Sequence, residues 1–284
     1  RHGILPARPG HPAGLIRQTT GKSMRLASWN VNSIKVRLPQ LIDWLNKAQP
    51  DVVGLQEIKC TADNFPFEPL RALGYEVAVS GQPTYNGVAV LSRYPITEVV
   101  TDLPGLDDPQ RRVLACTTGG IRFIDLYVPN GQAVGSDKYA YKLEWLAKLH
   151  AFLGDELTRH PLLAVVGDFN IAPQPEDVDN PAEWEGQVLF SEPERTAFQN
   201  LLALGLQDTF RLFPQEPKTF SWWDYRQNSF RRNRGLRIDH VLASTALASH
   251  CTASHIDREP RGWERPSDHA PAVADFGGLT APAT

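Results

Sequence analysis

A short apolar run that ends abruptly in polar residues constrains this chain more than any other feature. Leu162–Val166 is apolar and ends in two valines before Gly167, a pattern typical of a fully buried strand. Asp168 and Asn170 follow two residues apart, and in extended backbone they would point to the same side. The pair could orient a water molecule, a metal ion or a phosphate oxygen. The alternative is structural, because Asp, Asn and Gly favour turns at strand ends.

Length and composition limit the kinds of protein that this chain can be. A chain of 284 residues with 42% hydrophobic residues can bury an ordinary core as one large domain or two small ones. No apolar run approaches the roughly 20 residues of a membrane span, so we expect no membrane partner. The cysteines lack the spacing of zinc sites or disulfide frameworks, which favours a reducing, cytoplasmic location. The formal net charge of −3 gives no global basic field, so a nucleic-acid partner would need a local patch.

The sequence divides into one domain and two short ends. Residues 1–23 have several prolines and glycines and no sustained periodicity, and we expect a flexible N-terminal extension there. An organellar transit peptide or a misassigned upstream start are the alternatives, and Met24 is the expected first residue of the native chain. No repeat or low-complexity linker follows. We therefore expect a single domain at residues 24–278 and a disordered tail at residues 279–284.

Hydrophobic periodicity predicts many short strands joined by hairpins, with a few long helices between them. The expected strands are Arg25–Val31, Asp51–Glu57, Tyr75–Ser80, Gly87–Ser92, Val113–Thr118, Ile121–Val128, Leu162–Val166, Ile238–Ala243 and Ala272–Phe276. The expected helices lie around Leu38–Leu45, shortly before Gly74, over Lys138–Leu157 and near Glu194–Leu204. This pattern favours an α/β fold with antiparallel or mixed sheets covered by helices.

Polar side chains recur where the expected strands end. They are Asn30, Asn32, Glu57, Tyr127, Asp168, Asn170, Asp239, His240, Asp268 and His269. Each alone has a structural interpretation, but sites form where strand ends converge, so together they predict a catalytic site. Carboxylate and amide oxygens suit hard cations such as Mg²⁺ or Mn²⁺. Without a phosphate-binding glycine loop or a serine nucleophile motif, direct attack by water on a phosphodiester is preferred over a covalent intermediate.

Six segments, in order, carry a resemblance to a known family. They are Ser28–Ser33, Leu55–Lys59, Leu126–Gly131, Gly167–Pro173, Gly235–His240 and Ser267–Pro271. The chain resembles the bacterial exonuclease III family of the endonuclease/exonuclease/phosphatase superfamily, from Met24 to about Phe276. The resemblance implies a four-layer α/β/β/α sandwich, similar to deoxyribonuclease I, in which two mixed sheets pack face to face.

The resemblance also implies roles for the catalytic residues. Asp168 would activate the water or protonate the leaving oxygen, and Asn170 would orient the nucleophile. His269 would contact the scissile phosphate, held by Asp239, which favours its charged form. Tyr127 would donate a hydrogen bond to a phosphate oxygen.

A metal site is implied in the same way. Glu57 would be the principal ligand, with Asn30 beside it, and one or two Mg²⁺ or Mn²⁺ ions would bind. The full implied set is Asn30, Glu57, Asp168, Asn170, Asp268 and His269. Asp268 would ligate a second ion or serve as support. Asn32 stands where some relatives have Asp, which weakens the case for a fully acidic site.

An arginine-rich and aromatic stretch predicts a DNA-binding patch. Between Asp224 and Asp239 the chain has no acidic residue, and it carries Arg226, Arg231, Arg232, Arg234 and Arg237. Interleaved aromatic residues favour DNA over the alternative of a solvated loop. By resemblance, Trp222, Leu236 and Ile238 line a pocket for an extruded baseless sugar. The expected DNA contacts are Asn32, Lys59, Trp222, Arg226, Arg231, Arg232, Arg234, Leu236 and Ile238.

These observations lead to one expected function and three alternatives. We expect a monomeric, Mg²⁺-dependent DNA repair hydrolase that acts on double-stranded DNA with abasic sites or blocked 3′ ends, and that also removes nucleotides from 3′ ends. A 3′-end-processing exonuclease with little abasic-site incision is the first alternative, because Leu189 would crowd the pocket where several abasic-site-cutting relatives have Gly or Ser. The others are a phosphatase acting on inositol phosphates or lipids, and a catalytically dead DNA-binding module.

Overall fold

The computed structural model describes residues 22–279. Its strands are β1 (Lys22–Asn30), β2 (Val52–Gln56), β3 (Glu76–Ser80), β4 (Val88–Ser92), β5 (Thr97–Val100), β6 (Val113–Thr118), β7 (Ile121–Tyr127), β8 (Leu163–Asp168), β9 (Leu206–Asp208), β10 (Asp239–Ser244), β11 (Cys251–Ile256) and β12 (Ala272–Leu279). Its α-helices are α1 (Ile34–Ala48), α2 (Phe67–Ala72), α3 (Asp137–Arg159), α4 (Pro181–Trp184), α5 (Glu192–Leu202) and α6 (Thr245–Ala248). Within this range, no helix combines the length and apolarity needed to cross a bilayer.

Both expected domain boundaries fall inside strands. β1 begins at Lys22, ahead of residue 24, and β12 continues through Leu279, past residue 278. These two residues pair with each other across the antiparallel β1–β12 ladder, and Leu279 is buried, so the strands extend further than the boundaries expected from sequence. The expectations for residues 1–21 and 280–284 lie outside the described residues.

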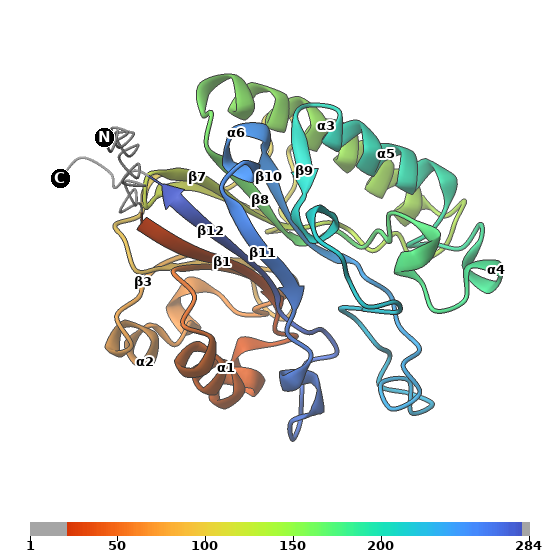
Figure 1. The fold of residues 1–284 in the computed structure, drawn as a ribbon, viewed down its shortest axis with the longest axis horizontal. Coiled ribbons are helices and arrows are strands. Elements are labelled where there is room, and N and C mark those ends of the chain that lie inside the picture. Colours follow the sequence, from red (N-terminus) through yellow and green to blue (C-terminus); the bar gives the residue numbers. More distant parts are fainter. Residues whose placement is uncertain (1–21, 280–284) are drawn as a thin grey trace, which may run out of the picture.

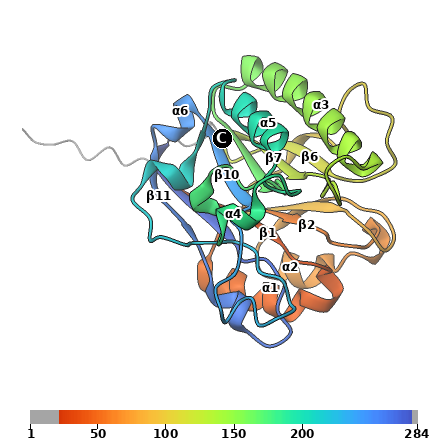
Figure 2. The same cartoon turned by 90° about the vertical axis from the view of Figure 1, so that its right-hand side faces the viewer.

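Two six-stranded mixed sheets lie at the centre of the fold (Figure 1). The first has the order β11-β12-β1-β2-β4-β3 and the second the order β5-β6-β7-β8-β10-β9. Each contains one parallel pair, β1 with β2 and β7 with β8. Figures 1 and 2 show α1 and α2 over the outer face of the first sheet, and α3 with α5 over that of the second. The expected four-layer α/β/β/α sandwich is therefore confirmed.

Both faces of the central strands are buried. In β1, Leu26 packs between the sheets against residues such as Phe123 and Val166, whereas the next residue, Ala27, packs with α1. In β8, Val165 faces α3 and α5, and Val166 faces the other sheet. Burying such an aliphatic side chain fully contributes about 1.5–3 kcal/mol. Burial on both faces explains why these strands appear in the sequence as continuous apolar runs.

Three edge strands escaped prediction because at most one residue of each is buried. β5, β9 and β11 are each the outermost strand of a sheet. Every residue of β5 is exposed, and β11 has a single buried residue, Ser254. A strand with little burial lacks the apolar signal on which sequence prediction depends.

Gly167 allows β8 to lie close to β7 just before the polar strand end. A Cβ atom at this position would stand 2.1 Å from the carbonyl oxygen of Leu126, its partner in the parallel ladder. The next pair in the register is Tyr127 with Asp168. The absence of a side chain at Gly167 therefore sets where Asp168 and Tyr127 meet.

We expect Gly167→Ala to lower the free energy of unfolding by about 1–3 kcal/mol, because the added methyl group collides with a neighbouring backbone. Urea denaturation measures the change. Gly154→Ala in α3 is the matched control: its Cβ would meet nothing closer than a side-chain carbon at 3.8 Å, so it should stabilise the protein by about 0.5–1 kcal/mol. Equal stability of the two variants would contradict this account of Gly167.

Candidate active site

Polar side chains from both sheets meet at one end of the sandwich. The first sheet brings Asn30, the last residue of β1, and Glu57, which follows β2. The second sheet brings Asp168, the last residue of β8, and Asp239, the first of β10, which pair across the antiparallel ladder. His269 precedes β12, and its carbonyl accepts a hydrogen bond from the buried indole of Trp29 at 3.1 Å. The expected convergence of strand ends is therefore observed.

Asn30 joins the two acidic groups at the centre of this site. Its Nδ2 donates to Glu57 Oε2 at 2.5 Å and to Asp168 Oδ2 at 2.9 Å, which links the two sheets. Asn30 is fully buried and Asp168 is 1% exposed. Potential ligand atoms of Glu57, Asp168 and His269 all lie within 4.8 Å of one another.

His269 stands between two carboxylates. Its Nδ1 lies 2.8 Å from Asp239 Oδ2 and its Nε2 lies 3.6 Å from Asp168 Oδ2. Burial opposes the charged imidazole, but Asp239 and Asp168 outweigh it and hold the pKa of His269 well above its usual value. His269 is thus an imidazolium that donates through Nδ1 to Asp239.

The environment of Asp168 raises the pKa of its carboxyl group towards neutral pH. Burial raises the pKa of Asp168 to about 7; His269 opposes this rise, and Asp239 and Glu57 add to it. The pKa of the Tyr127 hydroxyl is also raised well above its usual value, by burial and then by Glu57 and Asp168. A carboxyl group with a pKa near 7 suits general acid–base catalysis, and a neutral tyrosine remains a hydrogen-bond donor.

The charges and donor atoms fit a hard divalent cation. Glu57, Asp168 and Asp239 bring three carboxyl groups to a buried site that holds one imidazolium. A cation would relieve the excess negative charge, which is among the causes of the raised pKa of Asp168. Carboxylate oxygens match the preferences of Mg²⁺ and Mn²⁺.

The backbone around the site differs from the extended form expected at Asp168 and Asn170. Asn170 has φ 48°, in the left-handed region, so the expectation that both side chains project from one extended strand is wrong. Instead the chain turns: the Asn170 N–H donates to Asp168 Oδ1 at 3.0 Å, and its Nδ2 donates to the Val128 carbonyl at 2.8 Å. Glu57 also has a left-handed backbone, with φ 51°. These turns direct both residues back towards the strand ends.

Asp268, Asn32 and Lys59 lie at the rim of the site. Asp268 Oδ2 accepts from Trp222 Nε1 at 3.1 Å and Oδ1 accepts from Asn32 Nδ2 at 3.3 Å, so its carboxylate is engaged outside the Glu57, Asp168 and His269 cluster. Lys59 Nζ donates to Asn32 Oδ1 at 2.7 Å and lies 3.8 Å from Glu57 Oε1.

The arginines expected to bind DNA differ in their availability. Arg237 does not belong to the patch: it is 1% exposed and forms ion pairs with Asp177 and Asp208, so this expectation is corrected. Arg226 pairs with Asp224, and Arg234 with Asp179 and Glu183. Arg231 and Arg232 are exposed and form no ion pair with any residue in the range 22–279. Arg232 donates only to the Gln227 carbonyl, at 3.4 Å, so no described carboxylate balances the charge of either arginine.

The residues expected to form a pocket do come together. Leu236 and Ile238 are buried in one apolar cluster with Leu189, and Trp222 packs against it half-buried. Leu189 is 6% exposed and has φ 80°, a strained conformation for a residue with a branched side chain. Its side chain occupies space that Gly or Ser would leave open.

Sequence analysis missed a buried ion pair behind the site. Lys142 in α3 pairs with Glu194 in α5, and both side chains are fully buried. Lys142 Nζ also donates to the Asn170 carbonyl at 2.6 Å, and Glu194 accepts from the Leu189 N–H at 3.0 Å. The pair therefore ties the Asn170 turn and the Leu189 loop to the helices. One feature of the sequence could have indicated this pair: Lys142 lies between Tyr139 and Trp145 on the apolar face of its helix.

Lys142→Met should lower the free energy of unfolding by about 3–5 kcal/mol, because it leaves the Glu194 carboxylate buried without a partner. Urea denaturation tests this, and adding Glu194→Gln should recover part of the loss. Lys138→Met, at an exposed position of the same helix, is the control and should stay within about 0.5 kcal/mol of the unsubstituted protein. Similar effects of the two lysine substitutions would argue against the ion pair as an anchor.

Comparisons of sequence identify relatives over most of the chain. The model of the endonuclease/exonuclease/phosphatase family matches residues 27–269. Exodeoxyribonuclease III of Haemophilus influenzae is 37% identical over 266 residues, which cover 89% of this chain and 100% of that protein. The DNA repair nuclease APEX1 of Danio rerio is 30% identical over 259 residues, 88% of this chain and 81% of that protein.

Solved structures agree with these relatives. The 3′ phosphatase NExo from Neisseria, bound to a product DNA hairpin, superposes with a TM-score of 0.88 at 47% identity, covering 89% of this chain and 99% of that chain. An AP endonuclease from Archaeoglobus fulgidus gives a TM-score of 0.86 at 36% identity, with the same coverage of 89% and 99%.

Proposed function

Because this chain belongs to the endonuclease/exonuclease/phosphatase family, we propose that it is a DNA repair nuclease that hydrolyses phosphodiesters by direct attack of water. The observation that carries the proposal is the convergence of Glu57, Asp168 and His269 from both sheets. The relatives named as exodeoxyribonuclease III, DNA repair nuclease and 3′ phosphatase support DNA as the substrate. The proposed reactions are incision 5′ to abasic sites, removal of 3′ blocks and 3′-to-5′ exonuclease action on duplex DNA by a monomer.

Each side chain of the site has a task that its environment favours. Asp168, whose pKa is raised first of all by burial, takes a proton from the attacking water or returns one to the leaving oxygen. The His269 imidazolium and the neutral Tyr127 hydroxyl donate hydrogen bonds to oxygens of the scissile phosphate. Asn170, fixed by the turn after β8, orients the water. Asp239 keeps His269 charged and in place.

Glu57 and Asp168, with Asn30 beside them, would hold one or two Mg²⁺ or Mn²⁺ ions through their oxygen atoms, and His269 would join them as a ligand only in its neutral form. Such a cation supplies charge neutralisation at the phosphodiester. Outside this centre, the exposed Arg231 and Arg232 would contact DNA phosphates, and Asn32 and Lys59 would line the approach to the site.

Metal removal tests the proposed chemistry. Excess EDTA should abolish cleavage of a duplex with a 3′-phosphate, and added Mg²⁺ or Mn²⁺ should restore it, because buried carboxylates repel a phosphodiester unless a cation is present. Gel analysis of the products measures the effect, with circular dichroism as the check that the fold survives EDTA. Full activity in EDTA would refute the metal site.

Asp168→Asn should preserve the fold and lower turnover by about 10²–10⁴-fold, since a carboxamide has the same shape but cannot exchange the proton. Asp125→Asn is the matched control, another fully buried carboxyl group whose pKa burial raises. Among residues 22–279, Asp125 Oδ2 and Gln56 Oε1 have no hydrogen-bond partner, so we expect an amide at Asp125 to be accommodated and turnover to stay near that of the unsubstituted protein. Single-turnover cleavage and thermal melting on the same preparations separate catalysis from stability.

The conformation of Leu189 favours a second candidate, a 3′-end-processing enzyme with little abasic-site incision. Its side chain fills the cluster around Leu236 and Ile238 at a left-handed backbone position that suits glycine. Leu189→Gly should therefore increase incision at an internal stable abasic analogue at least tenfold relative to release of a 3′-phosphate. Val178→Ala, which opens the same cluster without changing the Leu189 backbone, is the control. An unchanged ratio in Leu189→Gly would exclude crowding by Leu189.

A further inference from the structure

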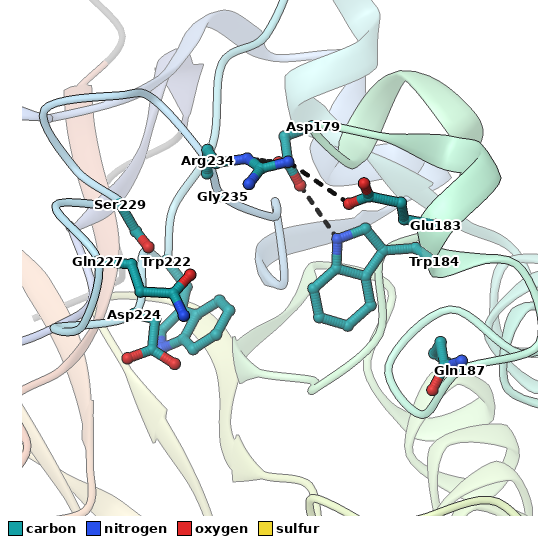
Figure 3. Close-up of a pocket in the computed structure, with 10 residues that line it drawn as sticks. All are labelled: Asp179, Glu183, Trp184, Gln187, Trp222, Asp224, Gln227, Ser229, Arg234 and Gly235. Carbon is teal, nitrogen blue, oxygen red and sulfur yellow. Dashed lines mark hydrogen bonds and ion pairs between the residues drawn. The ribbon is translucent and has the colours of Figure 1, made fainter.

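Polar side chains that fold away from water need hydrogen-bond partners. In the cavity that Figure 3 shows, for example, Asp179 accepts from Trp184 Nε1 at 3.0 Å and pairs with Arg234. Among residues 22–279, Asp125 Oδ2 and Gln56 Oε1 are exceptions, because each is buried without a hydrogen-bond partner. These two side chains contact each other, since Gln56 Nε2 donates to Asp125 Oδ1 at 2.7 Å.

The pair of Gln56 and Asp125 joins the two sheets behind the active site. Gln56 is the last residue of β2 in the first sheet, and Glu57 follows it. Asp125 lies in β7 of the second sheet, two residues before Tyr127. Both side chains of the pair are fully buried. Gly54 leaves the space for the carboxyl group, because a Cβ atom there would stand 2.7 Å from Asp125 Cγ.

The orientation of the Gln56 amide is fixed by its neighbours. Gln56 Nε2 lies 3.1 Å from the carbonyl oxygen of Gly54, which can only accept a hydrogen bond. The amide atom on that side must therefore be the nitrogen. The same nitrogen lies 3.0 Å from Ser28 Oγ. Gln56 Oε1 is thus the atom without a partner, and it requires a donor.

The strands around Asp125 provide no cation that faces its carboxyl group. β2, β4, β6 and β8 pack on β7. Besides Asp125, the titratable side chains of these five strands are Cys116, Arg122, Tyr127 and Asp168. Arg122, the one cation among them, pairs with Glu156 of α3. Cys116 is a neutral thiol, because burial raises its pKa to about 12.

A carboxylate in these surroundings is strongly disfavoured, because a buried charge needs a countercharge. Burial raises the pKa of Asp125 well above its usual value, although the hydrogen bond from Gln56 opposes the rise. A protonated carboxyl group, by contrast, carries one O–H donor. A proton on Asp125 Oδ2 that is donated to Gln56 Oε1 gives a partner to both atoms that lack one.

We propose that Asp125 is a neutral carboxylic acid at neutral pH, and that its proton completes a link of two hydrogen bonds with Gln56 between the sheets. In this link, the amide donates to the acid and the acid donates to the amide. Because Glu57 follows Gln56 and Tyr127 lies close after Asp125, the link fixes the separation of the two halves of the active site. Alkaline pH would remove the proton and break the second hydrogen bond. The inference goes beyond the proposed nuclease function, and its tests need no DNA.

Infrared spectroscopy measures the protonation state directly. At neutral pH, the difference spectrum between the unsubstituted protein and Asp125→Asn should contain the carbonyl band of a protonated carboxylic acid, which a carboxylate lacks. Asp63→Asn, at an exposed position, is the matched control and should give no such band. If Asp125→Asn does not fold, Gln56→Leu replaces it: the acid band should remain but move to higher wavenumber, because the acid loses its acceptor. Absence of an acid band from both comparisons would mean that Asp125 is ionised, and would overturn the inference.

The pH dependence of unfolding is a second test. The folded protein keeps a proton on Asp125 that the unfolded chain releases above about pH 4, so unfolding releases this proton and stability falls as the pH rises. The unfolding equilibrium constant of the unsubstituted protein, divided by that of Asp125→Asn, should therefore rise about tenfold per pH unit between about pH 5 and 7. Urea denaturation at several pH values gives this ratio. A ratio that is constant or falls over this range would contradict a protonated Asp125.

Discussion

The half-buried carboxylate of Glu57 and the buried carboxylates of Asp168 and Asp239 repel one another, and the surrounding structure depends on offsetting that repulsion. A buried ion without a partner costs several kcal/mol. Here Asn30 donates to two of the carboxylates, and His269 lies between Asp168 and Asp239. These groups belong to different sheets, so the apolar layer between the sheets must hold them together. Because the site holds more negative than positive charge, it is suited to bind a divalent cation. The bound cation would in turn attract a phosphate group.

The surrounding structure stabilises several strained backbone conformations near the site. Glu57, Asn170 and Leu189 all have left-handed backbone conformations, each of which costs about 1–3 kcal/mol for residues other than glycine. The buried pair of Lys142 and Glu194 binds the Asn170 and Leu189 segments to α3 and α5. This explains why a charged pair lies in the otherwise apolar layer of α3 and α5: it forms hydrogen bonds with buried backbone groups of Asn170 and Leu189.

Sequence predicted the features that local patterns encode and missed those that depend on distant partners. β8 was predicted because both of its faces are buried, whereas β5 and β11 at the sheet edges left no apolar signal. The strand ends that form the site were found by motif, but the turn at Asn170 was not. Arg237 was wrongly assigned to the surface. Its partners Asp177 and Asp208 are distant in sequence and come close only on folding, so no local pattern shows that Arg237 is buried.

The order of the chain has a consequence for protein synthesis. β1 carries Asn30, while His269 lies shortly before β12, which pairs with both β1 and β11 to complete the first sheet. A ribosome-bound chain that lacks this last strand holds Glu57 and Asp168 without the imidazolium that faces them. The pairing of β12 with β1 thus couples completion of the site to completion of the first sheet, so a chain without this pairing has no complete site.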